Sequence, residues 1–175
     1  MVVMATGPWL TDDEQRAWRS WLRAQVLVQA AIGRQLHEDA ELSEGDYAVL
    51  VHLSEHEDGR LRGKALAALL QWEKSRLSHH LTRMEKRGLV ARVECPTDGR
   101  GAFVVITEEG RARIEAAAPL HVAEVRRAFI DVLGPDDLRA LDAACSRIVD
   151  ALDTAAPCAG GDDTACGTDA DACDA

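Results

Sequence analysis

The amino-acid sequence predicts a mainly α-helical fold that carries one small β-hairpin. Apolar residues recur at helical spacing through most of the 175 residues. Two short extended runs, residues 89–95 and 102–107, flank a segment at residues 96–101 that is dense in turn-forming residues, so they predict a two-stranded hairpin. Apolar residues make up 47% of the chain, which is enough for a hydrophobic core. The predicted fold class is therefore mainly α with a small β-wing.

Two helices are predicted in the N-terminal third of the chain. Thr11 and Glu14 have the spacing of a capping box. They open a long helix that runs to about His37, with a broad apolar face that includes two tryptophans. The segment Ser-Glu-Gly-Asp at residues 43–46 opens a second helix, which carries Tyr47 and two further apolar residues on one side.

A helix, a turn and a second helix are predicted next. Residues 61–68 form the short helix, residues 70–72 the turn, and residues 74–87 the second helix, which ends at Gly88 because glycine favours the left-handed conformation of a helix stop. The hairpin follows directly. In a helix-turn-helix protein the second helix enters the major groove of DNA, and a basic hairpin beside it can grip the backbone or the minor groove. The order of parts therefore predicts a winged helix-turn-helix DNA reader.

Two more helices are predicted after the hairpin. Thr107 starts a long helix, whose early acidic residues are favoured by the helix dipole, and which runs to about Leu133. A Gly-Pro pair interrupts the chain there, and Pro135 suits the first position of a new helix. That last helix carries an apolar stripe, which needs a partner: Leu138, Leu141, Cys145, Ile148 and Leu152. Packing within one chain is the alternative to a dimer contact, which we favour.

The charge distribution supports DNA binding despite an acidic composition. The whole chain has a formal net charge of −10. Residues 60–100, however, hold ten Lys or Arg and four Asp or Glu, so that this segment carries +6 and the remainder −16. Phosphate contacts require a local basic face rather than a basic protein. A helix face that is merely solvated is the alternative interpretation.

The two ends of the chain differ in composition from the middle. We expect residues 1–10 to form an N-terminal arm, residues 11–153 the folded domain, and residues 154–175 a disordered acidic tail, since the tail contains no large apolar side chain. The tail cysteines, Cys158, Cys166 and Cys173, are eight and seven residues apart and lack the closer pairs of zinc sites. Five cysteines without paired spacing, no signal peptide and no long apolar run predict a cytoplasmic protein without a membrane span.

Several motifs follow one another in the middle of the chain. They are Leu66-Ala67, Lys74-Ser75-Arg76-Leu77-Ser78, the run from Leu81 to Val90, Asp98-Gly99-Arg100, and Val105-Ile106-Thr107-Glu108-Glu109-Gly110. In this order, and between long flanking helices, residues 11–153 resemble the multiple antibiotic resistance regulator (MarR) family of winged-helix repressors. The chain departs from the family pattern at Glu73, where a Ser or a similar cap usually precedes the reading helix.

The resemblance implies a homodimer that binds a pseudo-palindrome of double-stranded DNA and regulates transcription. Helices at about residues 11–37 and 107–153 would intertwine, and residues 59–107 would read DNA. The candidate DNA-binding residues are Lys74, Ser75, Arg76, Ser78, His79, His80, Arg83, Asp98 and Arg100. Arg76 suits guanine, Ser75 and His79 suit bases or phosphates, and the wing-tip Arg100 resembles the minor-groove arginine of the family. His79 and His80 point about 100° apart, so they do not face one groove equally.

Family members often release DNA when a small aromatic or anionic molecule binds between the dimer helices and the reading domain. The elements that would line such a pocket carry Trp18, Trp21, His37, Tyr47 and His52, although packing is the commoner role for the tryptophans. A winged helix used for protein contacts and a redox or metal sensor using the tail cysteines are the alternatives. No motif indicates an enzyme, and no cofactor is expected.

Overall fold

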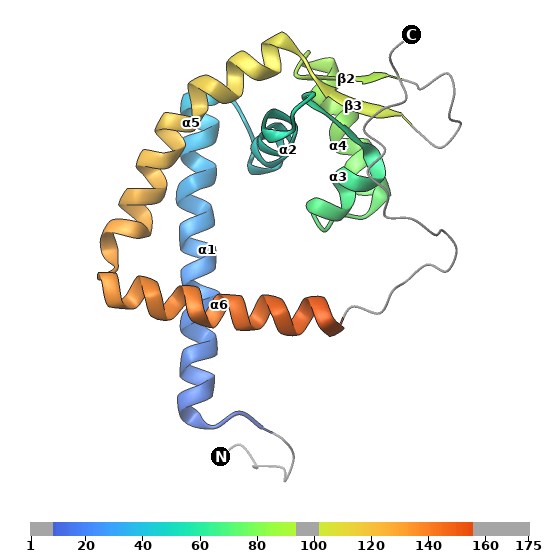
Figure 1. Ribbon diagram of the computed structural model, residues 1–175. Coiled ribbons are helices and arrows are strands. Elements are labelled where there is room, and N and C mark those ends of the chain that lie inside the picture. The colour runs from blue at the N-terminus through green and yellow to red at the C-terminus, as the bar shows by residue number, and fades with distance from the viewer. Residues whose placement is uncertain (1–8, 94–101, 156–175) are drawn as a thin grey trace, which may run out of the picture.

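The computed structural model describes residues 9–93 and 102–155, and it is mainly helical around a small sheet (Figure 1). The elements, in chain order, are α1 (Asp12–Ala40), α2 (Glu44–Glu55), β1 (Arg60–Arg62), α3 (Gly63–Leu69), α4 (Lys74–Lys86), β2 (Val90–Val93), β3 (Phe103–Ile106), α5 (Glu108–Ala128), the 3-10 helix η1 (Ile130–Val132) and α6 (Pro135–Ala155). The predicted fold class is confirmed. None of the described helices is both long and apolar enough to cross a membrane.

Capping boxes begin the first two helices. The hydroxyl of Thr11 accepts a hydrogen bond from the backbone N–H of Glu14, and the Glu14 carboxylate accepts one from the N–H of Thr11 at 2.7 Å. Ser43 and Asp46 make the same reciprocal pair at the start of α2. These bonds satisfy N–H groups that have no partner within the helix. The first helix continues three residues beyond the predicted end, to a left-handed Glu41.

The sheet has three strands where the sequence predicted a two-stranded hairpin. Residues 60–62 form the additional strand β1, so the prediction of helix from Leu61 is wrong, and α3 begins at Gly63 instead. The strand order is β1-β3-β2, with both pairs antiparallel and Leu61 opposite Val104. Pairing with β3 satisfies the backbone of residues 60–62, and this long-range contact overrides their local helical pattern.

The helix predicted from residue 107 to residue 133 ends earlier than expected. The hydroxyl of Thr107 caps α5 through the N–H of Gly110, as the sequence indicated, but α5 ends at Ala128. Phe129 leaves helical geometry with φ −138°, and the short helix η1 then leads to Gly134. Pro135 is the first residue of α6, as predicted.

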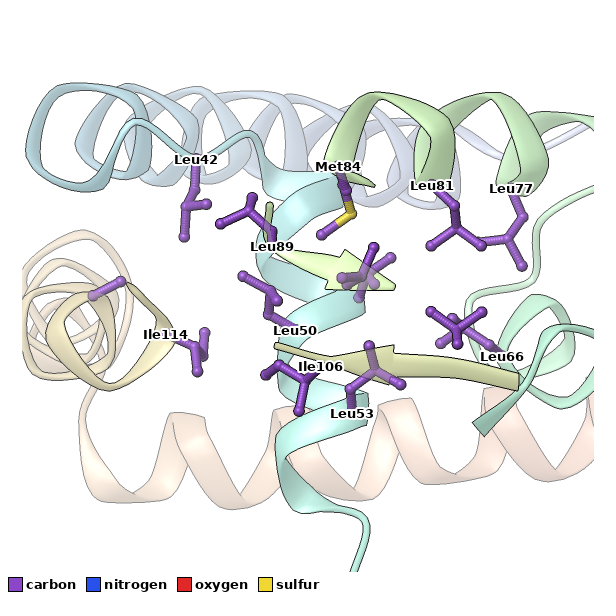
Figure 2. Packing of buried hydrophobic residues seen from close by; sticks show 14 of the residues in the cluster. Leu42, Leu50, Leu53, Leu66, Leu77, Leu81, Met84, Leu89, Ile106 and Ile114 are labelled. Carbon is purple, nitrogen blue, oxygen red and sulfur yellow. The ribbon is translucent and has the colours of Figure 1, made fainter. Parts of the chain in front are cut away.

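The core lies between α2, α4, the sheet and the start of α5 (Figure 2). Its central residues are fully buried leucines of α2, with Leu66 of α3 and Met84 of α4 beside them. In Figure 1, α2 lies between α1 and α5 on one side and the α3–α4 pair on the other. The core therefore fixes α4 relative to the long helices.

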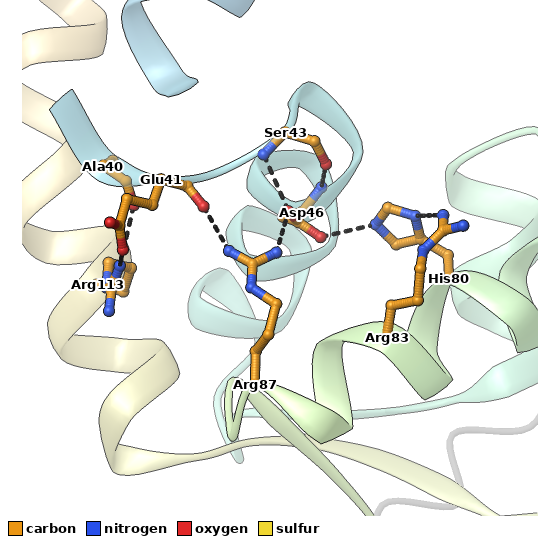
Figure 3. A network of polar contacts seen from close by, with 8 residues as sticks. All are labelled: Ala40, Glu41, Ser43, Asp46, His80, Arg83, Arg87 and Arg113. Carbon is orange, nitrogen blue, oxygen red and sulfur yellow. Dashed lines mark hydrogen bonds and ion pairs between the residues drawn. The ribbon is translucent and has the colours of Figure 1, made fainter. Parts of the chain in front are cut away.

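The C-terminal end of α1 is fastened to α5 by Arg113. Its guanidinium donates to the backbone carbonyl of Ala40 at 3.1 Å and forms an ion pair with Glu41 at 3.2 Å (Figure 3). It also forms an ion pair with Glu109 of α5 at 3.0 Å. A helix C-terminus leaves carbonyls without intrahelical partners. Arg113 satisfies one of them and joins two helices that are far apart in sequence.

Apolar side chains on α1 and α6 remain outside the core. Five of them, which we call the outer face, are exposed by between 42% and 66%: Trp18, Trp21, Leu22, Ile148 and Leu152. Among the described side chains of α6, none is buried. An amphipathic helix is normally stabilised by packing its apolar side, and the described protomer leaves that side of α6 open.

Candidate nucleic-acid interface

The turn between α3 and α4 is closed mainly by backbone hydrogen bonds. Gln71 adopts a left-handed conformation, with φ 52°, and its side chain donates to the carbonyl of Ala68. The N–H of Trp72 then returns to the carbonyl of Ala67 at 2.9 Å. Glu73 precedes α4 without a side-chain cap, as its departure from the family pattern suggested. The first N–H groups of α4 therefore have no cap from the Glu73 side chain, and the Glu73 carboxylate stands where a phosphate would approach them.

α4 has a core side and an outward side. Leu77, Leu81 and Met84 are buried in the core, as their spacing predicts. The outward side combines three cations with hydroxyl and imidazole groups, all of them exposed: Lys74, Ser75, Arg76, Ser78, His79 and Arg83. The structure thus leaves six of the predicted DNA-binding residues exposed on the part of the reading helix that is turned away from the core.

His80 departs from that prediction because its side chain faces inward. The residue is only 9% exposed, and its Nε2 atom lies 3.0 Å from a carboxylate oxygen of Asp46 on α2. A direct contact with DNA would require the imidazole to leave this site. His79, one residue earlier, is exposed, so the expectation that the two histidines point in different directions is confirmed.

Asp46 is the centre of a polar network between α2 and α4 (Figure 3). Its carboxylate accepts hydrogen bonds from Arg87 at 2.7 Å and from the backbone N–H of Ser43 at 2.9 Å, and it lies 3.0 Å from Nε2 of His80. Burial alone would raise the pKa of the Asp46 carboxyl, but the interactions with His80, Ser43 and Arg87 outweigh it and hold that pKa well below its usual range. Asp46 is therefore ionised at neutral pH.

Arg87, the residue that follows α4, has two partners in the structure. It pairs with Asp46, and it donates a second hydrogen bond to the backbone carbonyl of Glu41 after α1. These residues are more than 40 positions apart in the chain. No local spacing signals such a contact, so sequence reasoning had no means of finding it.

Trp72 supports the start of the reading helix from the turn. The guanidinium of Arg76 stacks on its ring, 4.3 Å from the ring centroid, and the edge of His80 meets the same indole at 5.1 Å between centroids. Gly45 of α2 lies against both rings, since a Cβ there would approach His80 to 2.9 Å and Trp72 to 3.0 Å. The first turn of α2 therefore fits closely against the side chains that flank Arg76.

Arg92 on β2 joins the wing to the reading helix. It donates to the backbone carbonyl of Ser78 at 2.9 Å and forms an ion pair with Glu85 at 3.0 Å. The base of the wing is thus positioned by α4 itself. The predicted wing-tip residues Asp98 and Arg100 lie outside the described residues.

The candidate effector residues are separated within one protomer. Trp18 and Trp21 are half-exposed on the N-terminal half of α1, and His37 is exposed near its C-terminal end. Trp18 lies 19 residues before His37, which places it about 28 Å away along the helix axis. Tyr47 and His52 are half-buried on α2. The structure therefore does not bring the tryptophans to Tyr47 within one chain, and a single pocket that includes all five residues is not formed there.

Tyr47 instead contacts His121, a residue of α5 that sequence reasoning missed. The two rings are 4.2 Å apart between centroids. Burial raises the pKa of the Tyr47 hydroxyl, with a further contribution from Glu55, and burial also lowers the pKa of the His121 imidazole. Both rings are consequently uncharged at neutral pH. Within the described part of the chain, Nδ1 of His121 is buried and makes no hydrogen bond.

Comparison with known proteins agrees with this geometry. A model of the MarR family matches residues 42–101, which include the reading helix and the wing. The transcriptional regulator HosA of Escherichia coli O111:H- is 35% identical over 102 residues, covering 58% of this chain and 74% of that protein.

Solved structures give the same result over a longer stretch. AbsC, a MarR family transcriptional regulator from Streptomyces coelicolor, superposes with a TM-score of 0.80 at 45% identity and covers 85% of this chain and 99% of its own. Sco3205 from the same organism, a MarR family regulator in complex with DNA, gives a TM-score of 0.78 at 40% identity and covers 82% and 94%. Sequence motifs, winged-helix architecture and these similarities agree, and the chain belongs to the MarR family of DNA-binding transcriptional regulators.

Proposed function

We propose that this protein is a homodimeric repressor that binds a specific pseudo-palindrome in duplex DNA and releases it when a small aromatic or anionic molecule binds. It would act in the cytoplasm, where the DNA is. The observation that carries the proposal is the outward side of α4, where Lys74, Arg76 and Arg83 are exposed on a helix fixed by the core. Both the shape and the charge of this surface suit a major groove.

The proposed contacts divide into those that read bases and those that hold the backbone. Residues near the start of a recognition helix most often reach base edges. We assign Arg76 to a guanine, because a guanidinium donates two parallel hydrogen bonds to its acceptors. Ser75, Ser78 and His79 are assigned to neighbouring bases or phosphates. Lys74 would contact a phosphate. Beyond the described residues, Arg100 is assigned to the minor groove, with Asp98 orienting it.

The dimer is proposed from the outer face. Trp18, Trp21 and Leu22 of α1 and Ile148 and Leu152 of α6 expose large apolar surfaces that water solvates poorly. Contact with the same helices of a second protomer would bury them. The domain layout would then be residues 11–153 for the regulator, including dimerisation helices at either end, with an arm before it and an acidic tail after it.

The proposed effector site lies where α5 packs against α1 and α2. Tyr47 and His121 offer uncharged rings there, and the buried Nδ1 of His121 offers a hydrogen-bonding group to a ligand. An aromatic molecule that also carries a polar or anionic group fits this combination. His52 and His37, on α2 and α1, would be secondary contacts, and Trp18 and Trp21 would reach the ligand only from a partner protomer.

Ligand binding would alter the spacing between the two reading helices. Half-sites lie about 34–36 Å apart when two recognition helices enter successive major grooves. A preference of about 1–3 kcal/mol for another spacing is enough for a useful switch.

Selection of genomic fragments with the purified protein tests the proposal. We expect enrichment of a pseudo-palindrome, and the affinity for it should fall about 10³-fold or more between 50 and 200 mM salt if the dimer makes roughly 6–10 phosphate contacts. A flat salt response on the best fragment would show that the protein does not read DNA in this way. Titration with phenolic and carboxylate compounds, followed by DNA release, then tests the effector.

A further inference from the structure

We propose that His80 is a positioning residue that holds the reading side chains Arg76 and Arg83 in place while its ring is neutral, so that protonation of the ring reduces sequence discrimination. The inference rests on the proposed reading of DNA by α4. It concerns the part of α4 that faces the protein rather than the DNA, and it makes the specificity of the interface sensitive to pH.

The partners of the two ring nitrogens determine where the proton lies. Arg83 Nη2 is 3.1 Å from Nδ1 of His80. A guanidinium has only donors, so Nδ1 must accept this hydrogen bond and carries no hydrogen. Nε2 then carries the hydrogen and faces the Asp46 carboxylate at 3.0 Å. Nδ1 of His80 thus accepts from a reading residue, while Nε2 lies beside the Asp46 carboxylate of α2 (Figure 3).

Arg76 is connected to the same ring through Trp72. The edge of His80 contacts the indole, and the guanidinium of Arg76 stacks on that indole at 4.3 Å. Gly45 leaves only enough space for both rings, since a Cβ at this position would meet each of them within 3.0 Å. A displacement of the imidazole would therefore be passed to Trp72 and from there to Arg76.

Protonation of His80 would change its contact with Arg83 more than its contact with Asp46. The charged groups around the ring are Asp46 from α2, with Arg87 paired to it, and Arg83 from α4 itself; Arg76 lies beyond the indole. A second ring proton leaves the side that faces Asp46 unchanged, because Nε2 carries a hydrogen in both forms. It removes the acceptor for Arg83 and puts a positive charge against that guanidinium. The loss falls on the reading residue.

A matched set of variants separates this role from simple packing. His80→Gln keeps one donor and one acceptor on a side chain that does not titrate, whereas His80→Phe keeps an aromatic ring without nitrogens. His56→Gln removes a histidine from an exposed loop and serves as the control. For each protein, fluorescence anisotropy gives the ratio of affinities for the selected operator and a scrambled duplex at pH 5.5 and pH 8.0, between which histidines change charge.

We expect the wild-type ratio and the His56→Gln ratio to fall roughly tenfold at pH 5.5, within the discrimination that one good base contact contributes. His80→Gln should keep a high ratio at both pH values, and His80→Phe a low ratio at both. His79 is present in both His80 variants, so a contribution from it cancels in that comparison. A wild-type ratio that is independent of pH, or a His80→Phe ratio equal to the wild-type ratio, would overturn the inference.

A measurement on the unmodified protein does not depend on any variant folding. Nitrogen-15 NMR of the histidine rings at pH 8.0 should show His80 as the tautomer with hydrogen on Nε2, and finding the hydrogen on Nδ1 would overturn the inference. If the wild-type protein binds its operator specifically but its specificity does not change with pH, only the inference about His80 is overturned, and the proposed function stands. Absence of specific binding by the wild-type protein at both pH values would instead overturn the proposed function and the inference with it.

Discussion

The winged-helix region, residues 44–93 and 102–106, encloses most of its large apolar side chains, whereas α6 and the first half of α1 present many of theirs to solvent. Leu50, Leu53, Leu66 and Met84 are fully buried, while Trp18 is 52% and Leu152 66% exposed. The enclosed region is stabilised within one chain. The outer face has comparable side chains but lacks a surface to pack against in the described protomer. The contrast separates the part of the molecule that packs its apolar residues within one chain from the part whose apolar surface the proposed second protomer would cover.

The largest expected effect comes from placing charges on the α6 stripe. The double variant Leu141→Glu, Ile148→Glu should give a monomer, because burying carboxylates at a dimer contact is costly. Operator affinity should fall about 10³-fold, the scale of avidity lost when one half-site contact remains. Analytical ultracentrifugation and anisotropy measure the two effects. Ala143→Glu, on the opposite side of α6, is the matched control, and a double variant that stays dimeric would show that the seam lies elsewhere.

Removing Asp46 tests the enclosed region. Asp46→Ala leaves His80 and Arg87 without their shared partner and should lower the free energy of unfolding by about 2–4 kcal/mol, less than for a wholly buried pair because Arg87 is 41% exposed. Urea denaturation measures the change. Removal of the exposed Arg16–Asp13 pair by Arg16→Ala should change little. If Asp46→Ala and Arg16→Ala lost equal free energies of unfolding, the network around Asp46 would not contribute more to stability than an exposed ion pair.

The same residue predicts a pH dependence. The pKa of the Asp46 carboxyl is lowered on folding, so its contribution to stability is complete above its unfolded pKa of about 3.9 and is lost as the pH falls toward the folded value. The stability difference between wild type and Asp46→Ala should narrow as the pH falls below about 4. If the difference in stability between the two proteins grew as the pH fell, folding would raise the pKa of the Asp46 carboxyl rather than lower it.

Arg76 of the reading helix and Arg100 of the wing are expected to contribute differently to DNA binding. Arg76→Ala should cost about 1–3 kcal/mol at one base position and relax sequence preference there. Arg100→Ala should weaken binding to many sequences, because a wing arginine responds to groove shape and charge. Binding of each variant to a panel of single-base operator changes distinguishes them. If both variants lost affinity by the same pattern across the panel, Arg76 would not read a base while Arg100 responds to groove shape.

The smallest effect is expected from deleting residues 156–175, which follow the end of α6. Folding, dimerisation and operator binding should be nearly unchanged, since the segment contains no large apolar residue. Loss of its five aspartates should raise DNA affinity slightly at low salt. Monomer formation after truncation would contradict this, and zinc bound only by the full-length chain would favour a metal role for the tail cysteines.

Local signals account for most of the fold that the sequence predicted. The caps at Thr11 and Thr107 and the stop at Gly88 each depend on residues that are close in the chain, and the structure contains all three. The strand β1 and the early end of α5 were missed, because pairing with β3 and the departure of Phe129 from helical geometry have no local signal.

The interface shows the same limit. Helical spacing predicted that Leu77, Leu81 and Met84 face the core, and they do. The inward turn of His80 depends on Asp46, 34 positions earlier, and the stacking of Tyr47 on His121 joins helices more than 70 positions apart. The periodicity of a single sequence predicts whether a helical residue faces the core or the solvent. It does not identify the residue, far away in the chain, that its side chain contacts.

The junction after α1 has a mechanical consequence. Arg113 holds Ala40 and Glu41 against α5, and Arg87 of the reading helix holds the carbonyl of Glu41. α1 is 29 residues long, which makes it a rod of about 43 Å with its far end at the outer face. If the rod pivots near that far end by about 5°, the clamped end travels roughly 4 Å, and α4 is carried with it. In the proposed dimer, a slight change in how the two protomers pack would therefore move each reading helix relative to its groove.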